Sequence, residues 1–365
     1  MIQKLAIKKL DWYIIKKFLG TYIYSLTIII SISVVFDFSE KIDDFMEGNA
    51  PTRAIIFDYY FTFVPYFSVL FSSMFTFIAV IFFTSRMAYQ SEIIAILSAG
   101  VSFRRIMYPY MISAFVIALF TFTMSNFVIP NTNKVKLDFE AKYFEKQDNY
   151  YTYSNIHKQV RSGIYIYLDN YSSYSKTGNN LWIEKYEGSR LVSKLIANKV
   201  SWDSTKRKWH VENYYIRDIN NFKEKLNVGA SIDTNLFITP SDFLKKDNRP
   251  EIMDYYELNA HIKKLTLQGS EILVDYQLEK YRRGSSAFAI FILTIIGLTL
   301  SCRKVRGGMG LHIGLGLMLT FSYILFDKFT SQFAVSGSLT PLFAVWLPNI
   351  VYLFIAYYLY RIAPK

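Results

Sequence analysis

The sequence predicts an α-helical polytopic membrane protein with six transmembrane helices, arranged 3+3 around an inserted antiparallel β domain. Six stretches lack Asp, Glu, Lys and Arg, and each has roughly the 18–20 residues that a helix needs to cross ~30 Å of hydrocarbon. They are residues 18–36, 59–85, 106–133, 285–302, 307–326 and 329–360. About 150 mixed polar residues separate the third stretch from the fourth, and much of that segment has the period-two pattern of strands.

The N-terminal membrane half covers residues 1–133 and is expected to hold the first three transmembrane helices. Residues 1–17 mix lysines with apolar residues and predict a short interfacial helix that places Trp12 at the headgroup level. The second helix, from about residue 54 to 85, is longer than one bilayer crossing requires. It is therefore expected to tilt, to extend beyond the bilayer or to kink at Pro65.

A short segment of about residues 90–104 lies between the second and third helices. It is too short to span a membrane and is framed by arginines, so an amphipathic cytoplasmic helix is expected. Ser91 is a candidate N-cap, and Glu92 suits the positive end of the helix dipole. Such a helix serves either as an interfacial anchor or as a docking surface for a soluble partner.

The inserted domain is expected at residues 134–284. Period-two alternation with turn residues between the runs predicts an antiparallel sandwich or jelly roll. Residues 251–283 return to helical spacing and lead into the fourth transmembrane helix. The expected strands include residues 164–168, 181–186, 191–202, 208–219 and 230–238.

The C-terminal membrane half, residues 285–365, contains the last three helices. Its middle helix is rich in glycine, and Gly310 and Gly314 have a spacing that permits close helix packing. These glycines pack either within the chain or at a seam with a partner. The hydroxyls of the first helix, among them Ser31 and Ser33, either bond to neighbouring helices or line a polar cavity.

The formal net charge of +12 is concentrated in the segments that lie inside if the N-terminus is cytoplasmic. Residues 1–17, 86–105, 303–306 and 361–365 together hold 13 basic residues and only two acids, Asp11 and Glu92. This is a positive-inside distribution, not the signature of a nucleic-acid binder. We therefore expect both termini in the cytoplasm and the central domain on the outer side.

Motifs of catalysis and of cofactor binding are absent from the sequence. No Gly is followed by Lys, which excludes a Walker A loop, and no Gly-x-Ser-x-Gly occurs. The four histidines lack metal-ligand spacing, and Cys302 is the only cysteine. We expect no catalytic residue, no metal, no cofactor and no nucleic-acid partner. The classes that remain are a transport subunit and a membrane-anchored scaffold or sensor that binds a partner through its β domain.

Residues 91–102, Ser-Glu-Ile-Ile-Ala-Ile-Leu-Ser-Ala-Gly-Val-Ser, are the core of a resemblance that covers nearly the whole chain. Pro109, Val128-Ile129-Pro130 and Trp346-Leu347-Pro348-Asn349 complete the pattern. Together with the topology, they resemble the LptF/LptG permeases of lipopolysaccharide export. Leu10-Asp11-x-Tyr13-Ile14 and Tyr323-x-Leu325 are more similar to LptG, whereas the acid-rich outer end of the first helix departs from it.

The resemblance implies a permease in the bacterial inner membrane that extracts lipopolysaccharide from the outer leaflet. It further implies three partners: a paralogous permease, a cytoplasmic ABC ATPase dimer and a periplasmic bridge protein. The ATPase-coupling candidates are Glu92, Ile96, Gly100 and Arg104. The lipid-contact candidates are Asp37, Lys41, Arg53, Lys134 and Lys136, and the lateral-gate candidates are Ser31, Ser33, Gly310 and Gly314.

Overall fold

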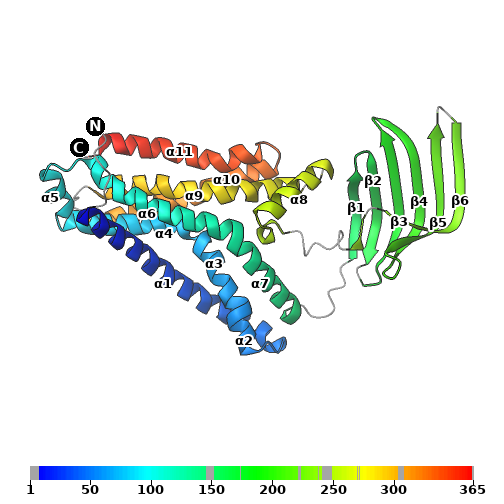
Figure 1. Ribbon diagram of the computed structural model, residues 1–365, viewed down its shortest axis with the longest axis horizontal. Helices are drawn as coiled ribbons and strands as arrows, with labels where there is room; N and C mark the ends of the chain where they lie inside the picture. The colour runs from blue at the N-terminus through cyan, green and yellow to red at the C-terminus, as the bar shows by residue number, and fades with distance from the viewer. Residues whose placement is uncertain are drawn as a thin grey trace. The chain divides into compact units, whose positions relative to one another are not determined.

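The computed structural model describes residues 8–144, 152–172, 174–220, 223–236, 238–240, 249–268, 270, 272–302 and 308–363. The chain divides into two compact units (Figure 1). The membrane unit comprises Met1–Phe144, Glu251–Tyr255 and Gln277–Lys365. The β unit comprises Glu145–Pro250 and Tyr256–Tyr276.

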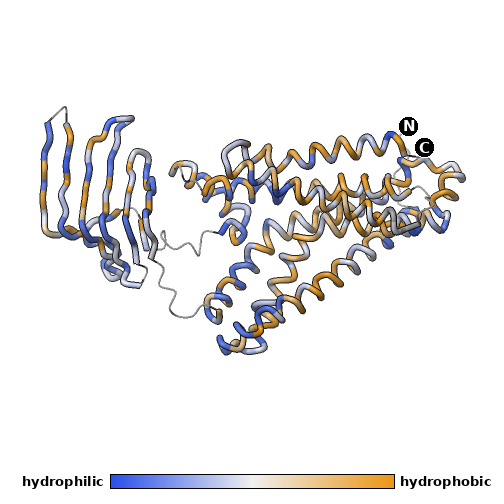
Figure 2. Tube along the Cα trace, turned by 180° about the vertical axis from the view of Figure 1, so that it is seen from behind, coloured by the Kyte–Doolittle hydropathy of each residue, from blue (hydrophilic) through white to orange (hydrophobic). Residues whose placement is uncertain are grey.

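The described residues include six helices long and apolar enough to cross a membrane, which confirms the predicted number. Figure 2 shows that the helices of the membrane unit are hydrophobic along most of their length. In chain order, the N-terminal elements are α1 (Lys9–Glu47), α2 (Thr52–Ala54), η1 (Ile55–Tyr60), α3 (Phe61–Leu70), α4 (Ser72–Tyr89), α5 (Glu92–Ser98), α6 (Phe103–Thr123), η2 (Met124–Val128) and α7 (Ile129–Tyr143). The C-terminal helices are α9 (Leu273–Ser301), α10 (Gly308–Val335) and α11 (Pro341–Ile362).

The segment predicted as interfacial runs directly into the first span. From Lys9 onward, α1 is one uninterrupted helix of 39 residues, so residues 9–17 form its first turns; residues 1–7 lie outside the described part. Trp12 remains 62% exposed, as expected of a headgroup-level residue. The helix continues because nothing in this segment, neither Pro nor Gly, interrupts its backbone hydrogen bonds before the apolar stretch.

The second span is divided at Phe71, and not at Pro65, which is one of the three possibilities considered for its length. Pro65 lies inside α3, and the interruption comes at Phe71, between α3 and α4. Upstream, η1 is a π-helical turn, and η2 is its counterpart in the third span, between α6 and α7. A proline removes only one backbone donor, and the Val64 carbonyl beside it accepts a 2.7 Å hydrogen bond from the Ser68 hydroxyl.

Three hydrophobic clusters lie in the described part of the membrane unit, and the two larger ones hold its helices together. One joins α1, α4, α6 and α9, with Phe18, Val80 and Tyr110 among its buried members. The other joins α4, α9, α10 and α11, around Phe77, Leu293 and Tyr352. Because α4 and α9 belong to both of these clusters, they are the two central helices of the unit.

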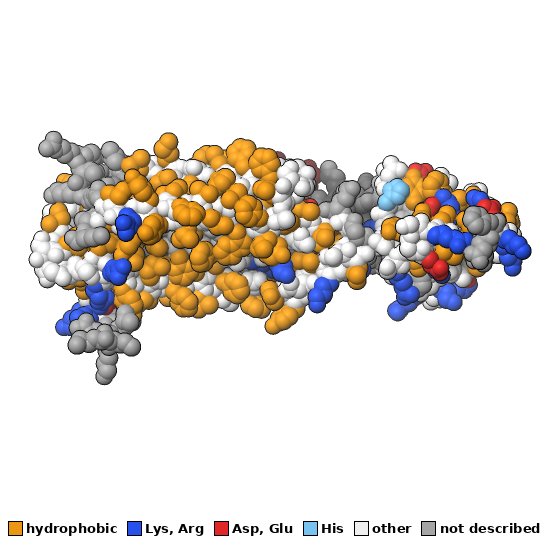
Figure 3. All heavy atoms as spheres, turned by 90° about the horizontal axis from the view of Figure 1, so that it is seen from above, with side chains coloured by type: hydrophobic (Ala, Val, Ile, Leu, Met, Phe, Trp, Pro, Cys, Tyr) orange, Lys and Arg blue, Asp and Glu red, His pale blue; other side chains and the backbone are white. Residues whose placement is uncertain are grey.

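Helices α1 and α10 lie at the edges of this packing. Only 17% of the most apolar window of α1 and 22% of that of α10 are buried, against 61% in α4 and in α9. Figure 3 shows hydrophobic side chains over the visible face of the membrane unit and Lys and Arg side chains at the end where α1 begins. The exposed apolar faces of α1 and α10 are therefore available to lipid or to another membrane helix.

The β unit contains one six-stranded antiparallel sheet in which neighbouring strands follow sequence order. This confirms the antiparallel domain between the two helical halves. Among the described residues the sheet is a meander and differs from the two Greek keys of a jelly roll. Tight turns at Gly163 and Gly188, both with positive φ, return the second strand beside the first and the fourth beside the third. The strands are β1 (Thr152–Arg161), β2 (Ile164–Ser172), β3 (Thr177–Glu187), β4 (Arg190–Asp203), β5 (Lys208–Asn220) and β6 (Lys223–Thr234).

The chain after β6 packs on one face of the sheet. Leu236 and Ile238 are buried in the core formed by residues such as Ile166, Leu181 and Trp209. The Trp209 indole N–H donates a 2.7 Å hydrogen bond to the Ile238 carbonyl. The unit also contains helix α8 (Tyr255–Gln268), whose His261 ring lies 4.9 Å from the Tyr276 ring.

Candidate functional site

The short helix α5 lies where α1 begins and α11 ends (Figure 1). Ile93 is buried at 1% exposure, and Ile96 and Leu97 pack against the same core. Ile94 is 45% exposed on the other side, beside exposed Ala95 and Ser98. The amphipathic character predicted from the sequence is thus present, but Ile96 lies on the inner side of the helix and not on the outer surface.

The two ends of α5 have backbone conformations that shape this surface. Ser91 is the N-cap residue of α5, as predicted, but it adopts a left-handed conformation with φ of 62°, and its side chain makes no cap hydrogen bond. Gly100 has φ of 82°, which favours glycine, and a Cβ there would meet open space. The chain therefore reverses tightly after α5 and enters α6.

The polar residues around α5 bond to other helices. Glu92 accepts a 3.4 Å hydrogen bond from the Tyr13 hydroxyl of α1. Arg104 donates a 3.0 Å hydrogen bond from Nε to the Tyr360 hydroxyl of α11. Of the four predicted coupling residues, Glu92 and Arg104 connect α5 and its exit to the first and last helices of the chain.

An ion pair that the sequence reasoning missed lies beside them. Arg105 donates from Nη1 and Nη2 to the two oxygens of Asp11, at 2.6 and 2.5 Å. Asp11 is 1% exposed, whereas the Arg105 side chain keeps 32% of its surface. The pair is therefore worth less than the about 3–5 kcal/mol lost on breaking a fully buried pair. The sequence held a signal: Asp11 and Glu92 are the two acids of the basic inner segments, and both bond across helices.

The lipid-contact candidates are brought together only in part. Lys41 lies 3.5 Å from Asp37 in an ion pair and also donates to the Tyr59 hydroxyl. Tyr59 and Tyr60 in turn donate to Asp37, at 3.3 and 3.2 Å. The Asp37 carboxylate thus neutralises Lys41 within one chain.

Lys136 belongs to the same aromatic environment. It lies 3.6 Å from Glu140, and its ammonium is 5.2 Å from the Tyr59 ring centroid. Arg53, in contrast, is an exposed residue of α2, and Lys134 is half-buried in α7. The structure therefore gathers Asp37, Lys41 and Lys136 around Tyr59 and leaves Arg53 on the surface.

The gate candidates lie on the two peripheral helices. The Ser31 hydroxyl is exposed and donates 2.8 Å to the Thr27 carbonyl of its own helix, and Ser33 is half-buried. At Gly310 and Gly314 a Cβ would meet no described atom within 4 Å, so neither glycine packs within the described part of the chain. Gly316, which sequence analysis did not single out, is the close-packed one, and its Cβ would lie 2.1 Å from Ile81 Cδ1.

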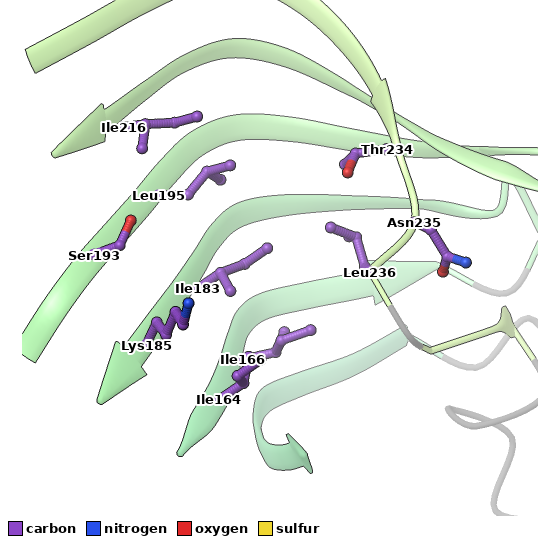
Figure 4. A pocket seen from close by; sticks show the side chains of 10 residues that line it. All are labelled: Ile164, Ile166, Ile183, Lys185, Ser193, Leu195, Ile216, Thr234, Asn235 and Leu236. Atoms are coloured by element: carbon purple, nitrogen blue, oxygen red, sulfur yellow. The ribbon is translucent and has the colours of Figure 1, made fainter. Parts of the chain in front are cut away.

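One face of the sheet contains a shallow apolar cavity of about 240 Å³. Figure 4 shows Ile166, Ile183 and Leu195 side by side on neighbouring strands, with Leu236 of the segment after β6 beside them. On the opposite face of the sheet, the Lys194 ammonium lies 2.8 Å from Glu184 and holds the pKa of that carboxyl below its usual range. The cavity could accept apolar chains and offers no catalytic constellation.

Potential metal ligands do not gather anywhere in the described residues: no group of three or more His, Cys, Asp or Glu could hold a metal ion. Cys302 is buried, and its thiol bonds the Thr299 carbonyl at 3.2 Å. His312 lies in α10, and its side chain is outside the described part.

Six helices long and apolar enough to cross a membrane, a β unit inserted among them and a short helix between the second and third spans define a multi-pass membrane protein. The chain belongs to the LptF/LptG family: the family model described as lipopolysaccharide export system permease LptF/LptG matches residues 12–362. No individual curated protein matches the chain. The match extends through both helical halves and the β unit, so the family's transport class applies to the whole chain.

Proposed function

We propose that the chain is the permease subunit of an ABC transporter that extracts lipopolysaccharide from the outer leaflet of the bacterial inner membrane. A separate cytoplasmic ATPase dimer powers it, a paralogous permease completes the lipid cavity, and a periplasmic bridge protein receives the lipid. Both termini lie in the cytoplasm and the β unit in the periplasm. The basic residues of the inner segments support this orientation.

The observation that carries the proposal is the two-sided packing of α5. One side is fixed by Ile93 to the core of the membrane unit, while Ile94 and its exposed neighbours form a free surface of the kind that a soluble ATPase could grip. Glu92 stands at the edge of that surface, bonded to Tyr13. Family membership favours transport over the alternative of a membrane-anchored scaffold or sensor.

Lipopolysaccharide phosphates meet the outer end of the membrane unit in this proposal. Exposed Arg53 is the first basic residue available to them. Lys41 and Lys136 are held by carboxylates, so a phosphate would replace or share those partners. The apolar face of the sheet would then take up acyl chains, in contact with Ile183 and Leu195.

The experiment that tests the proposal is Glu92→Lys in the full chain, coexpressed with the ATPase and the partner permease. We expect the ATPase to be lost on purification, or ATP hydrolysis to continue without lipid release, because a positive charge replaces the lone acid at the docking surface. Arg217→Ala, which breaks an exposed ion pair with Glu224 in the sheet, is the control. Normal ATP-driven lipid release by Glu92→Lys would contradict the proposal.

A further inference from the structure

Asp11 is a buried acid in the first turn of α1 that the proposed function leaves without a role. Its oxygens accept the two Arg105 hydrogen bonds and a 2.7 Å bond from the Lys8 backbone N–H. A carboxylate with 1% exposure requires such partners to remain charged. Because two guanidinium nitrogens bond two carboxylate oxygens, the pair fixes the orientation of the Arg105 side chain as well as its distance from Asp11.

Two bonds from α1 reach the chain at the start of α5 and just after its end. Tyr13 of α1 bonds Glu92, the first residue of α5. Asp11 bonds Arg105, in the first turn of α6, shortly after α5 ends at Ser98. The first two turns of α1 are therefore joined to the entry and to the exit of the short helix.

Helix α1 is built to carry a displacement along its length. It is a single helix of 39 residues, about 58 Å at a rise of 1.5 Å per residue, without proline. The second span, in contrast, is interrupted at Phe71. At its far end α1 holds Asp37 and Lys41, in the polar cluster around Tyr59.

We propose that the Asp11–Arg105 ion pair, assisted by the Tyr13–Glu92 bond, transmits movement of α5 to α1 and thus to the outer end of the membrane unit. This inference rests on the proposed function, because α5 moves only if an ATPase grips it. Asp11 and Arg105 are positioning residues: they touch neither ATP nor lipid. A shift of one helix can be transmitted to its neighbour when the packing between them has two discrete arrangements.

The test uses the full permease complex with its ATPase, reconstituted in vesicles that contain lipopolysaccharide. Asp11→Asn keeps the shape of the side chain and removes its charge, and Arg105→Lys keeps the charge and removes the two-point contact. In both variants we expect ATPase binding and hydrolysis to persist while lipid released per ATP falls about tenfold, a typical coupling factor between sites. The exchanged pair Asp11→Arg with Arg105→Asp is expected to recover part of the loss.

Tyr22→Phe is the matched control, because it removes the 2.8 Å bond between α1 and Ser72 about a third of the way along the helix. It should keep normal coupling. The inference is overturned if lipid released per ATP is unchanged in both variants, if Tyr22→Phe uncouples equally, or if both variants lose the ATPase or fail to fold. A wild-type complex that releases no lipid with ATP would instead refute the proposed function, whatever the variants do.

Discussion

Single polar residues in this protein are positioned by partners from distant parts of the chain. The Ser72 hydroxyl lies 2.8 Å from the Tyr22 hydroxyl and 2.9 Å from the Thr121 hydroxyl, so it links α1, α4 and α6. Thr84 and Tyr110 form a similar pair at 2.9 Å. Hydroxyl bonds between helices hold membrane bundles together, because unbonded polar groups are costly in hydrocarbon.

His261 of the β unit is a polar residue with a different environment. Its Nε2 is buried without a hydrogen-bond partner among the described residues, and its ring packs on Tyr276. Burial, with a smaller contribution from the Lys264 ammonium, lowers the pKa of His261 from 6.5. The folded unit therefore disfavours the imidazolium form.

Acidification should loosen the contact between α8 and the start of α9. The unfolded form binds a proton at His261 near pH 6.5 and the folded form only at lower pH, so local stability is present above 6.5 and declines as pH falls below it. Hydrogen exchange of residues 255–276, corrected for intrinsic rates, measures this. The His261→Phe variant should lose the pH dependence. Equal protection of the wild type at pH 7.5 and pH 5.5 would show that protonation of the His261 ring does not weaken the contact.

At the scale of elements, α10 presents two glycine faces with different neighbours. Gly316 packs on Ile81 and Phe77 of α4, where an added methyl group would force the Ile81 side chain to move. At Gly310 and Gly314 an added methyl group would meet no described atom within 4 Å. Within the described residues, close packing therefore accounts for Gly316 but not for Gly310 or Gly314, which remain candidates for a seam with a partner.

Alanine substitutions should separate the two faces. Gly316→Ala is expected to destabilise the membrane unit by about 1–3 kcal/mol, the usual cost of overpacking. Gly314→Ala should be neutral or stabilising by up to about 1 kcal/mol, because alanine favours the helix over glycine. Thermal unfolding of the purified permease in detergent compares them. If both variants were equally stable, the close contact between α10 and α4 would be refuted.

At the scale of the whole molecule, the two helices with the lowest burial, α1 and α10, carry the gate candidates. We expect α1 of this chain to face the helix equivalent to α10 in the paralogous permease. A cysteine at Ser33 and one in that partner helix should crosslink readily, and the crosslink should stop ATP-driven lipid release until it is reduced. The natural Cys302 is buried, which leaves the background reaction low. A crosslink that forms and leaves release unchanged would show that the seam does not open.

The sequence by itself determined the six spans, the antiparallel β unit between them and the short helix near Glu92. Uncharged length, strand alternation and charge asymmetry are local properties, and the hydrocarbon and the backbone impose them on any chain of this composition. Only the tertiary structure decided that Asp11 pairs with Arg105, that Lys41 is neutralised by Asp37, and that Gly316 packs instead of Gly310 and Gly314. These contacts depend on which faces of distant helices meet, and the pattern along one segment does not contain that information. The order of the strands in the β unit is likewise decided by the folded domain.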